Sequence, residues 1–154
     1  MAAIDVLLEQ TIAELQGFVA VLAAERDALV SGDIDQLPTI ADQKSQLAIR
    51  LAGLEAERDA AQRSAGFAAG RVGLDAWVGT SARPTAALGM RQRYLELAGA
   101  AKRENELNGK LIAARIQQNQ QALATLLGEA ADATPYGADG QQKSSSGRRP
   151  LGSA

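Results

Sequence analysis

The fold is decided by residues 4–37, which read IDVLLEQTIAELQGFVAVLAAERDALVSGDIDQL. Apolar residues recur here at steps typical of one helix face. That face comprises Leu8, Thr11, Ile12, Leu15, Phe18, Val19, Leu22 and Leu29. The run Ser31-Gly32-Asp33 then interrupts the pattern, because glycine ends many helices and Asp33 or Asp35 can cap the next one. We therefore expect a first helix over about residues 4–30.

A second helix is predicted over about residues 35–63. Its apolar stripe comprises Leu37, Ile40, Ala41, Leu47, Leu51 and Leu54. Pro38 fits only the first turn of such a helix, where backbone N–H groups have no helical acceptor. Because the link between the two helices is short, they should form an antiparallel hairpin.

Residues 64–83 differ in composition from the helical segments around them. Four glycines are scattered through this stretch, which also holds Trp77, the chain's one tryptophan. Leu74, Trp77 and Val78 can form one apolar turn within a longer connection. We expect a loop whose tryptophan docks on the hairpin.

The third predicted helix is the longest and runs over about residues 84–131, starting at Pro84. Its apolar stripe comprises Leu88, Leu95, Ala98, Ile112, Ile116, Leu123, Leu126 and Ala130. Polar residues, among them Asn105 and Asn119, interrupt the middle of that stripe. A helix of about 45 residues spans roughly 68 Å, about twice either helix of the hairpin. It should therefore bend or break near Gly99 or Gly109, or extend beyond the hairpin at one end.

Residues 134–154 are rich in Gly, Ser and Gln, so they bury too little apolar surface to offset their ordering entropy. We expect a flexible tail there and a single helical domain over residues 1–133. The predicted fold class is all-α: an antiparallel helical hairpin plus a third long helix, as in a three-helix bundle or coiled coil.

The composition argues against an enzyme. The chain has no His and no Cys, which removes the commonest general base near neutral pH, a thiol nucleophile and the usual transition-metal ligands. Acidic neighbours such as Glu55, Glu57 and Asp59 point in different directions on a helix, so they should not converge on a substrate. We predict no catalytic residues, no cofactor and no metal.

Net charge and hydropathy limit the partners and the cellular compartment that can be expected. A net charge of −2 lacks the basic excess of nucleic-acid-binding domains. The first residues lack the cationic start of a signal peptide, and no apolar run approaches the length needed to cross a bilayer. We therefore expect a cytoplasmic protein that binds no nucleic acid and does not insert stably into a membrane.

Protein binding through helix faces remains as the expected chemistry. Leu111, Ile112, Ile116, Leu123, Leu126 and Leu127 supply more apolar area than one stripe needs, so they are candidate partner-binding residues. Asn105 and Asn108 have two open interpretations: they fix helix register, or their amides bond to a partner. Tyr136, followed by Gly137 and Gly140, is likewise either part of a turn or an anchor for a partner's pocket.

Several sequence motifs resemble those of the FlgN family of flagellar type III secretion export chaperones. They are Glu25–Leu29 with Gly32–Leu37, Lys44–Leu47 with Leu54–Arg58, Asn105-Glu-Leu-Asn-Gly-Lys-Leu-Ile112 and Tyr136-Gly-Ala-Asp-Gly140. The likeness covers roughly residues 4–140, apart from residues 64–83. Glu104 departs from the pattern, since the family has a leucine beside the first Asn.

The resemblance implies a cytoplasmic chaperone that binds hook–filament junction proteins of the FlgK and FlgL type. Because of the spare apolar area on residues 111–127, we expect these residues, with Asn105 and Asn108, to hold the client. Tyr136, Gly137 and Gly140 would dock on an export-gate protein of the FlhA type. The alternative function is a scaffolding coiled-coil protein that self-associates, and a membrane-surface protein comes third.

Overall fold

The computed structural model describes residues 3–133, which form helices joined by short turns. The elements follow in the order α1 (Ile4–Ser31), the 3-10 turn η1 (Ile34–Gln36), α2 (Leu37–Ser64), α3 (Gly70–Thr80) and α4 (Pro84–Ala133). Because no strand occurs within residues 3–133, the predicted all-α class is confirmed. The predicted tail, residues 134–154, lies outside the described residues.

Helix α1 buries the face that its periodicity predicts. Its buried positions are Ile4, Leu7, Leu8, Thr11, Leu15, Leu22, Glu25, Ala28 and Leu29. The helix ends at Gly32, whose φ of 79° is left-handed and whose N–H donates to the carbonyl oxygen of Ala28 at 3.0 Å. A side chain is strained at such a φ, so the glycine stop is confirmed with its physical reason.

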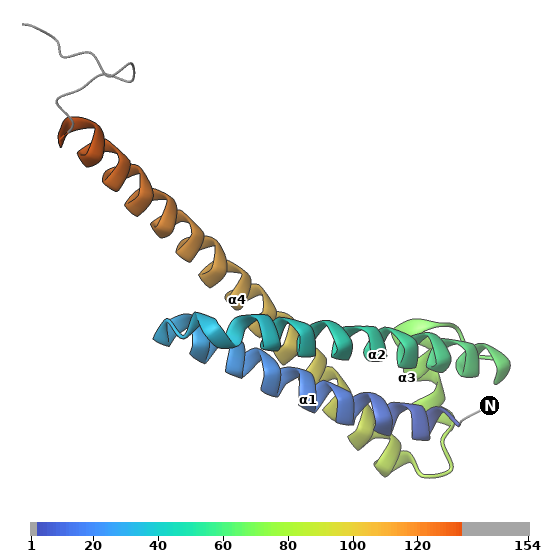
Figure 1. Ribbon diagram of the computed structural model, residues 1–154. Helices are drawn as coiled ribbons and strands as arrows, with labels where there is room; N and C mark the ends of the chain where they lie inside the picture. The colour runs from blue at the N-terminus through green and yellow to red at the C-terminus, as the bar shows by residue number, and fades with distance from the viewer. Residues whose placement is uncertain (1–2, 134–154) are drawn as a thin grey trace, which may run out of the picture. The chain divides into compact units, whose positions relative to one another are not determined.

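The turn after Gly32 folds the chain back, and α1 and α2 lie side by side in opposite directions (Figure 1). The predicted hairpin is therefore confirmed. The predicted capping by Asp33 or Asp35 is wrong. Gln36 precedes α2 and makes no side-chain cap bond, whereas Asp33 accepts a hydrogen bond from Nε2 of Gln36 at 2.7 Å.

Helix α3 occupies part of the stretch predicted as a loop, so the loop prediction is wrong for Gly70–Thr80. Two side chains of α2 hold the turn that leads into it. The Nε2 of Gln62 donates to the carbonyl oxygens of Ala68 (2.8 Å) and Gly70 (3.0 Å). The Oδ1 of Asp59 accepts from the backbone N–H of Gly70 at 2.9 Å. Helix propensity takes no account of hydrogen bonds from a neighbouring helix, and it is low in a glycine-rich stretch.

The docking predicted for Trp77 is confirmed, although the residue comes from a helix. Leu74 is buried in one cluster with Ile4, Leu7, Leu8 and Ala61, and Trp77 packs against that cluster. Helix α3 also lies close against the turn that precedes it, which requires that Gly73 have no side chain. A Cβ atom there would lie 1.6 Å from the carbonyl oxygen of Ala68.

Helix α4 continues through Gly99 and Gly109, so the suggested break does not occur at either glycine. Its buried residues between Pro84 and Ala113 are Ala87, Leu97, Ala101 and Asn108. The predicted stripe is wrong at Leu88, which is 53% exposed. At this end of the helix the packing residues are Ala87, which is buried, and Tyr94, which packs against the core.

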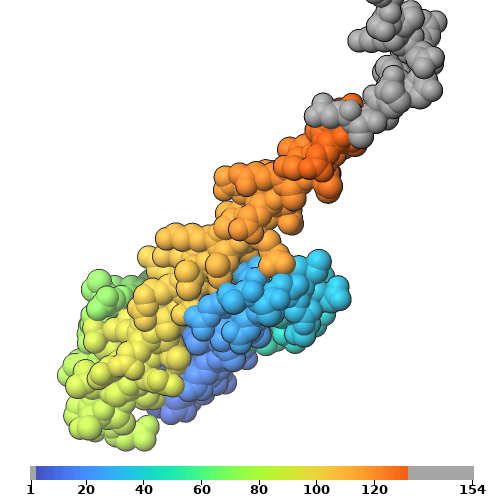
Figure 2. Space-filling model, turned by 90° about the vertical axis from the view of Figure 1, so that its left-hand side faces the viewer, coloured from blue at the N-terminus to red at the C-terminus, as the bar shows by residue number. Residues whose placement is uncertain are grey.

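The core runs along α1 as two adjoining clusters. The second cluster consists of Leu15, Leu22, Leu97 and Ala101, and the partly buried Ile12 and Tyr94 pack against both clusters. Figure 2 shows the first part of α4, in yellow, lying directly against α1, in blue. The core is therefore shared by α1, α2, α3 and the first part of α4.

Length and composition alone would allow α1 to cross a membrane, so the expectation that no apolar run reaches that length is wrong. The apolar face of α1, however, supplies Leu7, Leu8, Leu15 and Leu22 to the core clusters. Core helices of soluble proteins pass the same test of length and composition.

The chain divides into two compact units, Met1–Ala113 and Ala114–Ala154. Of the second unit, the structure describes Ala114–Ala133, which belongs to α4. Cooperative folding of residues 1–133 as one domain stays a prediction.

Candidate functional site

The candidate binding surface lies on α4 within the second unit. Ile116, Leu123, Leu126 and Leu127 expose 52%, 57%, 63% and 63% of their surface. Every described side chain from Ile116 to Ala131 is exposed. Clustered apolar side chains exposed to this degree commonly mark an interaction surface. We call these four residues the α4 apolar patch.

Helix geometry brings the patch together. Steps of three, four and seven residues return to nearly the same side of a helix, which places Ile116, Leu123 and Leu126 in one row with Leu127 at its edge. Asn119 falls in the same row, between Ile116 and Leu123. A helix laid along this row meets four apolar side chains and one amide.

Leu111 and Ile112 belong to the first unit and are half-buried, so the structure does not group them with the exposed patch. Consecutive helical residues differ in direction by about 100°, and these two therefore face different ways. Of the six apolar residues predicted to bind a partner, four are openly exposed.

The two asparagines of the predicted site occupy different environments. Asn105 is exposed, whereas Asn108 has no exposed surface. The Nδ2 of Asn108 donates to the carbonyl oxygen of Leu22 at 2.9 Å and to Oε2 of Glu25 at 2.8 Å. A residue placed in this way has no surface for a client. We assign Asn108 to packing, which is one of the two interpretations that its sequence context leaves open.

Asn108 completes a buried polar cluster between α1, α2 and α4. Glu25 is buried, and its Oε2 also pairs with Nζ of Lys44 at 3.1 Å. A buried carboxylate is tolerable when a cation and further hydrogen bonds satisfy it. The Oδ1 of Asn108 has no hydrogen-bond partner among the described residues. The cluster fixes how α4 lies against the hairpin at the level of Leu22.

A second polar cluster joins α2 to α4. Arg58 is buried and its guanidinium lies 4.8 Å from the centre of the Tyr94 ring. The Tyr94 hydroxyl donates to Oε1 of Glu55 at 3.1 Å and accepts from Nη2 of Arg58 at 3.4 Å. Burial raises the pKa of Tyr94, and the nearby Arg58 opposes that rise. Arg58 and Tyr94 therefore contribute to the packing of α4 on α2.

Ion pairs lie along the contacts between the helices of the first unit. They join Glu25 to Lys44 and Glu14 to Arg50 (α1 to α2), Arg26 to Glu104 (α1 to α4), Asp75 to Arg91 (α3 to α4) and Asp5 to Arg83. The hydrogen bond from Arg91 holds the pKa of the Asp75 carboxyl below its usual range. Apart from the pair of the buried Glu25 with Lys44, these pairs are at least partly exposed, so they contribute little stability but select register.

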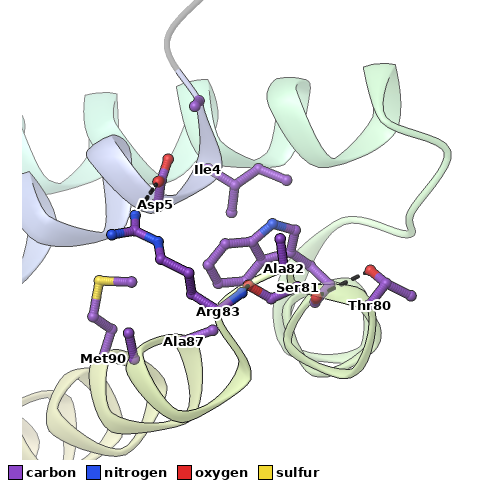
Figure 3. A pocket seen from close by; sticks show the side chains of 11 residues that line it. Ile4, Asp5, Thr80, Ser81, Ala82, Arg83, Ala87 and Met90 are labelled. Carbon is purple, nitrogen blue, oxygen red and sulfur yellow. Dashed lines mark hydrogen bonds and ion pairs between the residues drawn. The ribbon is translucent and has the colours of Figure 1, made fainter.

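A pocket of about 360 Å³ opens at the end of the bundle where α1 begins. Ile4, Trp77 and Met90 are among the residues that line it, and Arg83, which pairs with Asp5, also belongs to its lining (Figure 3). Its hydroxyl groups are already engaged, since Thr80 donates to the carbonyl oxygen of Trp77 and Ser81 accepts from the N–H of Arg83. We find no catalytic arrangement there.

Two of the acidic residues singled out from the sequence bind different structural groups. Glu55 accepts a hydrogen bond from the Tyr94 hydroxyl, and Asp59 accepts one from the N–H of Gly70. Each therefore has a structural partner of its own. No group of metal-ligating side chains occurs within the part of the chain that the structure describes.

Tyr136, Gly137 and Gly140, the predicted gate-docking residues, lie outside the described residues. Sequence reasoning missed the buried cluster of Asn108, Glu25 and Lys44. One signal was present: Glu25 lies three residues after Leu22, within the apolar periodicity of α1, and a buried carboxylate there needs a hydrogen-bonding or cationic partner.

The comparisons with known proteins concern nearly the whole chain. The model of the FlgN protein family matches residues 1–144. No curated protein and no solved structure matches the chain. The match covers the first unit and residues 114–144 of the second, which include the α4 apolar patch.

Proposed function

Because the chain belongs to the FlgN family of flagellar export chaperones, we propose that it holds hook–filament junction proteins in the cytoplasm before their export. The observation that carries this proposal is the α4 apolar patch, four large apolar side chains at least 52% exposed. Exposed apolar residues at helical spacing suit an amphipathic helix of a client, which lays its own apolar face on them. Covering both faces keeps them from aggregating.

A test compares three aspartate variants along α4. Ile116→Asp and Leu127→Asp place a charge within the patch, whereas Leu88→Asp places it at a similarly exposed leucine, 53% exposed, far along the helix. We expect the two patch variants to weaken binding of a purified hook–filament junction protein at least about tenfold, because burial of a full Leu or Ile contributes 1.5–3 kcal/mol. Leu88→Asp should bind like the parent. Circular dichroism checks that all three stay helical.

If Ile116→Asp and Leu127→Asp stay folded and bind as tightly as the parent, the client site lies elsewhere. If the parent itself binds no junction protein, the chaperone proposal fails for these clients.

We further propose that Tyr136, with Gly137 and Gly140, docks the loaded chaperone on the export gate. The family resemblance of this motif supports the proposal. Tyr136→Ala should leave the melting temperature and client affinity unchanged. It should weaken binding to the export-gate protein by about 2 kcal/mol, the size of a binding hot spot. A clear drop in melting temperature with unchanged gate binding would make Tyr136 structural.

A further inference from the structure

The row that carries the patch continues a pattern used elsewhere in α4. In the first unit, Leu97, Ala101 and Asn108 follow one another at steps of four and seven residues and are buried against the hairpin. The same steps continue through Ile112, Ile116, Asn119, Leu123 and Leu126. In the first unit this pattern packs on helices; in the second, its side chains are exposed.

The charge around the two parts of the pattern differs. Each helix that contacts another in the first unit contributes to an ion pair, as in Arg26 with Glu104 and Glu25 with Lys44. From Ile116 to Gly128, however, the sequence contains no charged residue, and Gln117–Gln121 reads Gln-Gln-Asn-Gln-Gln. Most solvated helix faces carry charges. A helix face without charged residues cannot form an ion pair with a partner.

From these two observations we propose that residues 116–128 recognise the client without ion pairs. The client's contacting face is an apolar helical stripe flanked by uncharged amide or hydroxyl side chains. A client charge facing Gln120 or Asn119 would lose water and gain no opposite charge, which is unfavourable. The proposal rests on the proposed chaperone function and adds the chemical class of the partner's surface.

A second copy of the chain is a poorer occupant of this face. The row spans fewer than three heptads and includes Asn119, so a self-paired coil offers few apolar contacts against the entropy lost on association. Without charges to set the register, the face can accept more than one client helix.

The sign of an introduced charge tests the proposal. Gln120 lies four residues after Ile116 and three before Leu123, so it adjoins the patch, and it is exposed. We would measure the affinity of the full chain for a purified hook–filament junction protein after Gln120→Glu and after Gln120→Lys. Both should weaken binding, by roughly tenfold, because neither charge finds a counterion. Glu, Lys and Gln have similar helix propensities, so folding is preserved.

Gln121 provides the matched control. It is exposed, two residues before Leu123, and therefore lies on the opposite side of the helix from the row. Gln121→Glu and Gln121→Lys should change affinity less than about twofold, as expected of charges remote from an interface. The parent's affinity should change less than about threefold between 50 and 500 mM sodium chloride, since no ion pair is there to be screened.

Three results would overturn the proposal while leaving the chaperone function intact. In the first, the Gln120 variants shift affinity in opposite directions. In the second, the parent's affinity falls tenfold or more with salt. In the third, sedimentation shows a dimer that Leu123→Asp abolishes while client affinity is unchanged. Failure of the parent to bind any junction protein would instead overturn the chaperone function itself.

Discussion

Leu97 and Leu126 both belong to α4, and about eight helical turns of sequence separate them. Yet Leu97 is 8% exposed and Leu126 is 63% exposed. Leu97 packs with Leu15 and Leu22 of α1, whereas every described side chain around Leu126 is exposed. One periodic pattern thus supplies a core in the first unit and a binding surface in the second. Periodicity identifies a face, and only its surroundings determine what that face does.

The same substitution at these two leucines should separate folding from binding. We expect Leu97→Ala to lower the free energy of unfolding by about 2–5 kcal/mol, because it leaves a cavity in the core. Leu126→Ala should lower it by less than about 0.5 kcal/mol, as at other exposed sites, and should weaken client binding instead. Urea denaturation measures the first pair of values. Equal losses of stability would mean that Leu126 is covered in solution.

A substitution at Gly73 would test how closely α3 packs on the turn that precedes it. A methyl group there meets the carbonyl oxygen of Ala68 at 1.6 Å, so Gly73→Ala should destabilise the protein by about 3 kcal/mol. Nothing lies within 4 Å of a Cβ placed on Gly79 in the same helix, and Gly79→Ala should be neutral or stabilise by up to about 1 kcal/mol. Thermal unfolding distinguishes the two. A mild effect at Gly73 would show that α3 packs less closely on its turn.

The two asparagines give a smaller contrast of the same kind. Asn108→Ala should lower the free energy of unfolding by about 1–3 kcal/mol, since it removes a buried donor from the Glu25 carboxylate. Asn105→Ala, at an exposed position, should stay within about 0.5 kcal/mol of the parent. Client affinity should be insensitive to Asn108→Ala at a temperature where the variant is folded. Weakened binding there would return Asn108 to the client site.

The smallest expected effect is a pH dependence confined to the first unit. Burial raises the pKa of Tyr94 in the folded chain above its unfolded value near 10. The folded state therefore holds this proton more tightly, and its contribution to stability is complete below that unfolded pKa. It is lost as pH rises through the folded pKa. Melting temperature should fall more steeply above pH 10 in the parent than in Tyr94→Phe. Parallel curves would contradict the assignment.

The sequence by itself determined the all-α class, the hairpin and the stop at Gly32, and it placed the leucines at 123, 126 and 127 on a helix with spare apolar surface. These features depend on local signals, namely the spacing of apolar residues and the backbone freedom of glycine. Such signals act within a few residues of the chain. They are legible without knowledge of any neighbouring helix.

Tertiary structure alone decided the features that depend on a neighbour. Helix α3 forms in a glycine-rich stretch because Gln62 and Asp59 of α2 bond to the turn before it. Asn108 is buried and Asn105 exposed although both carry the same side chain, because only Asn108 meets Leu22 and Glu25 of α1. The choice of Ala87 over Leu88 as a packing residue has the same origin. Burial depends on what lies opposite a face, and spacing along one helix carries no record of that.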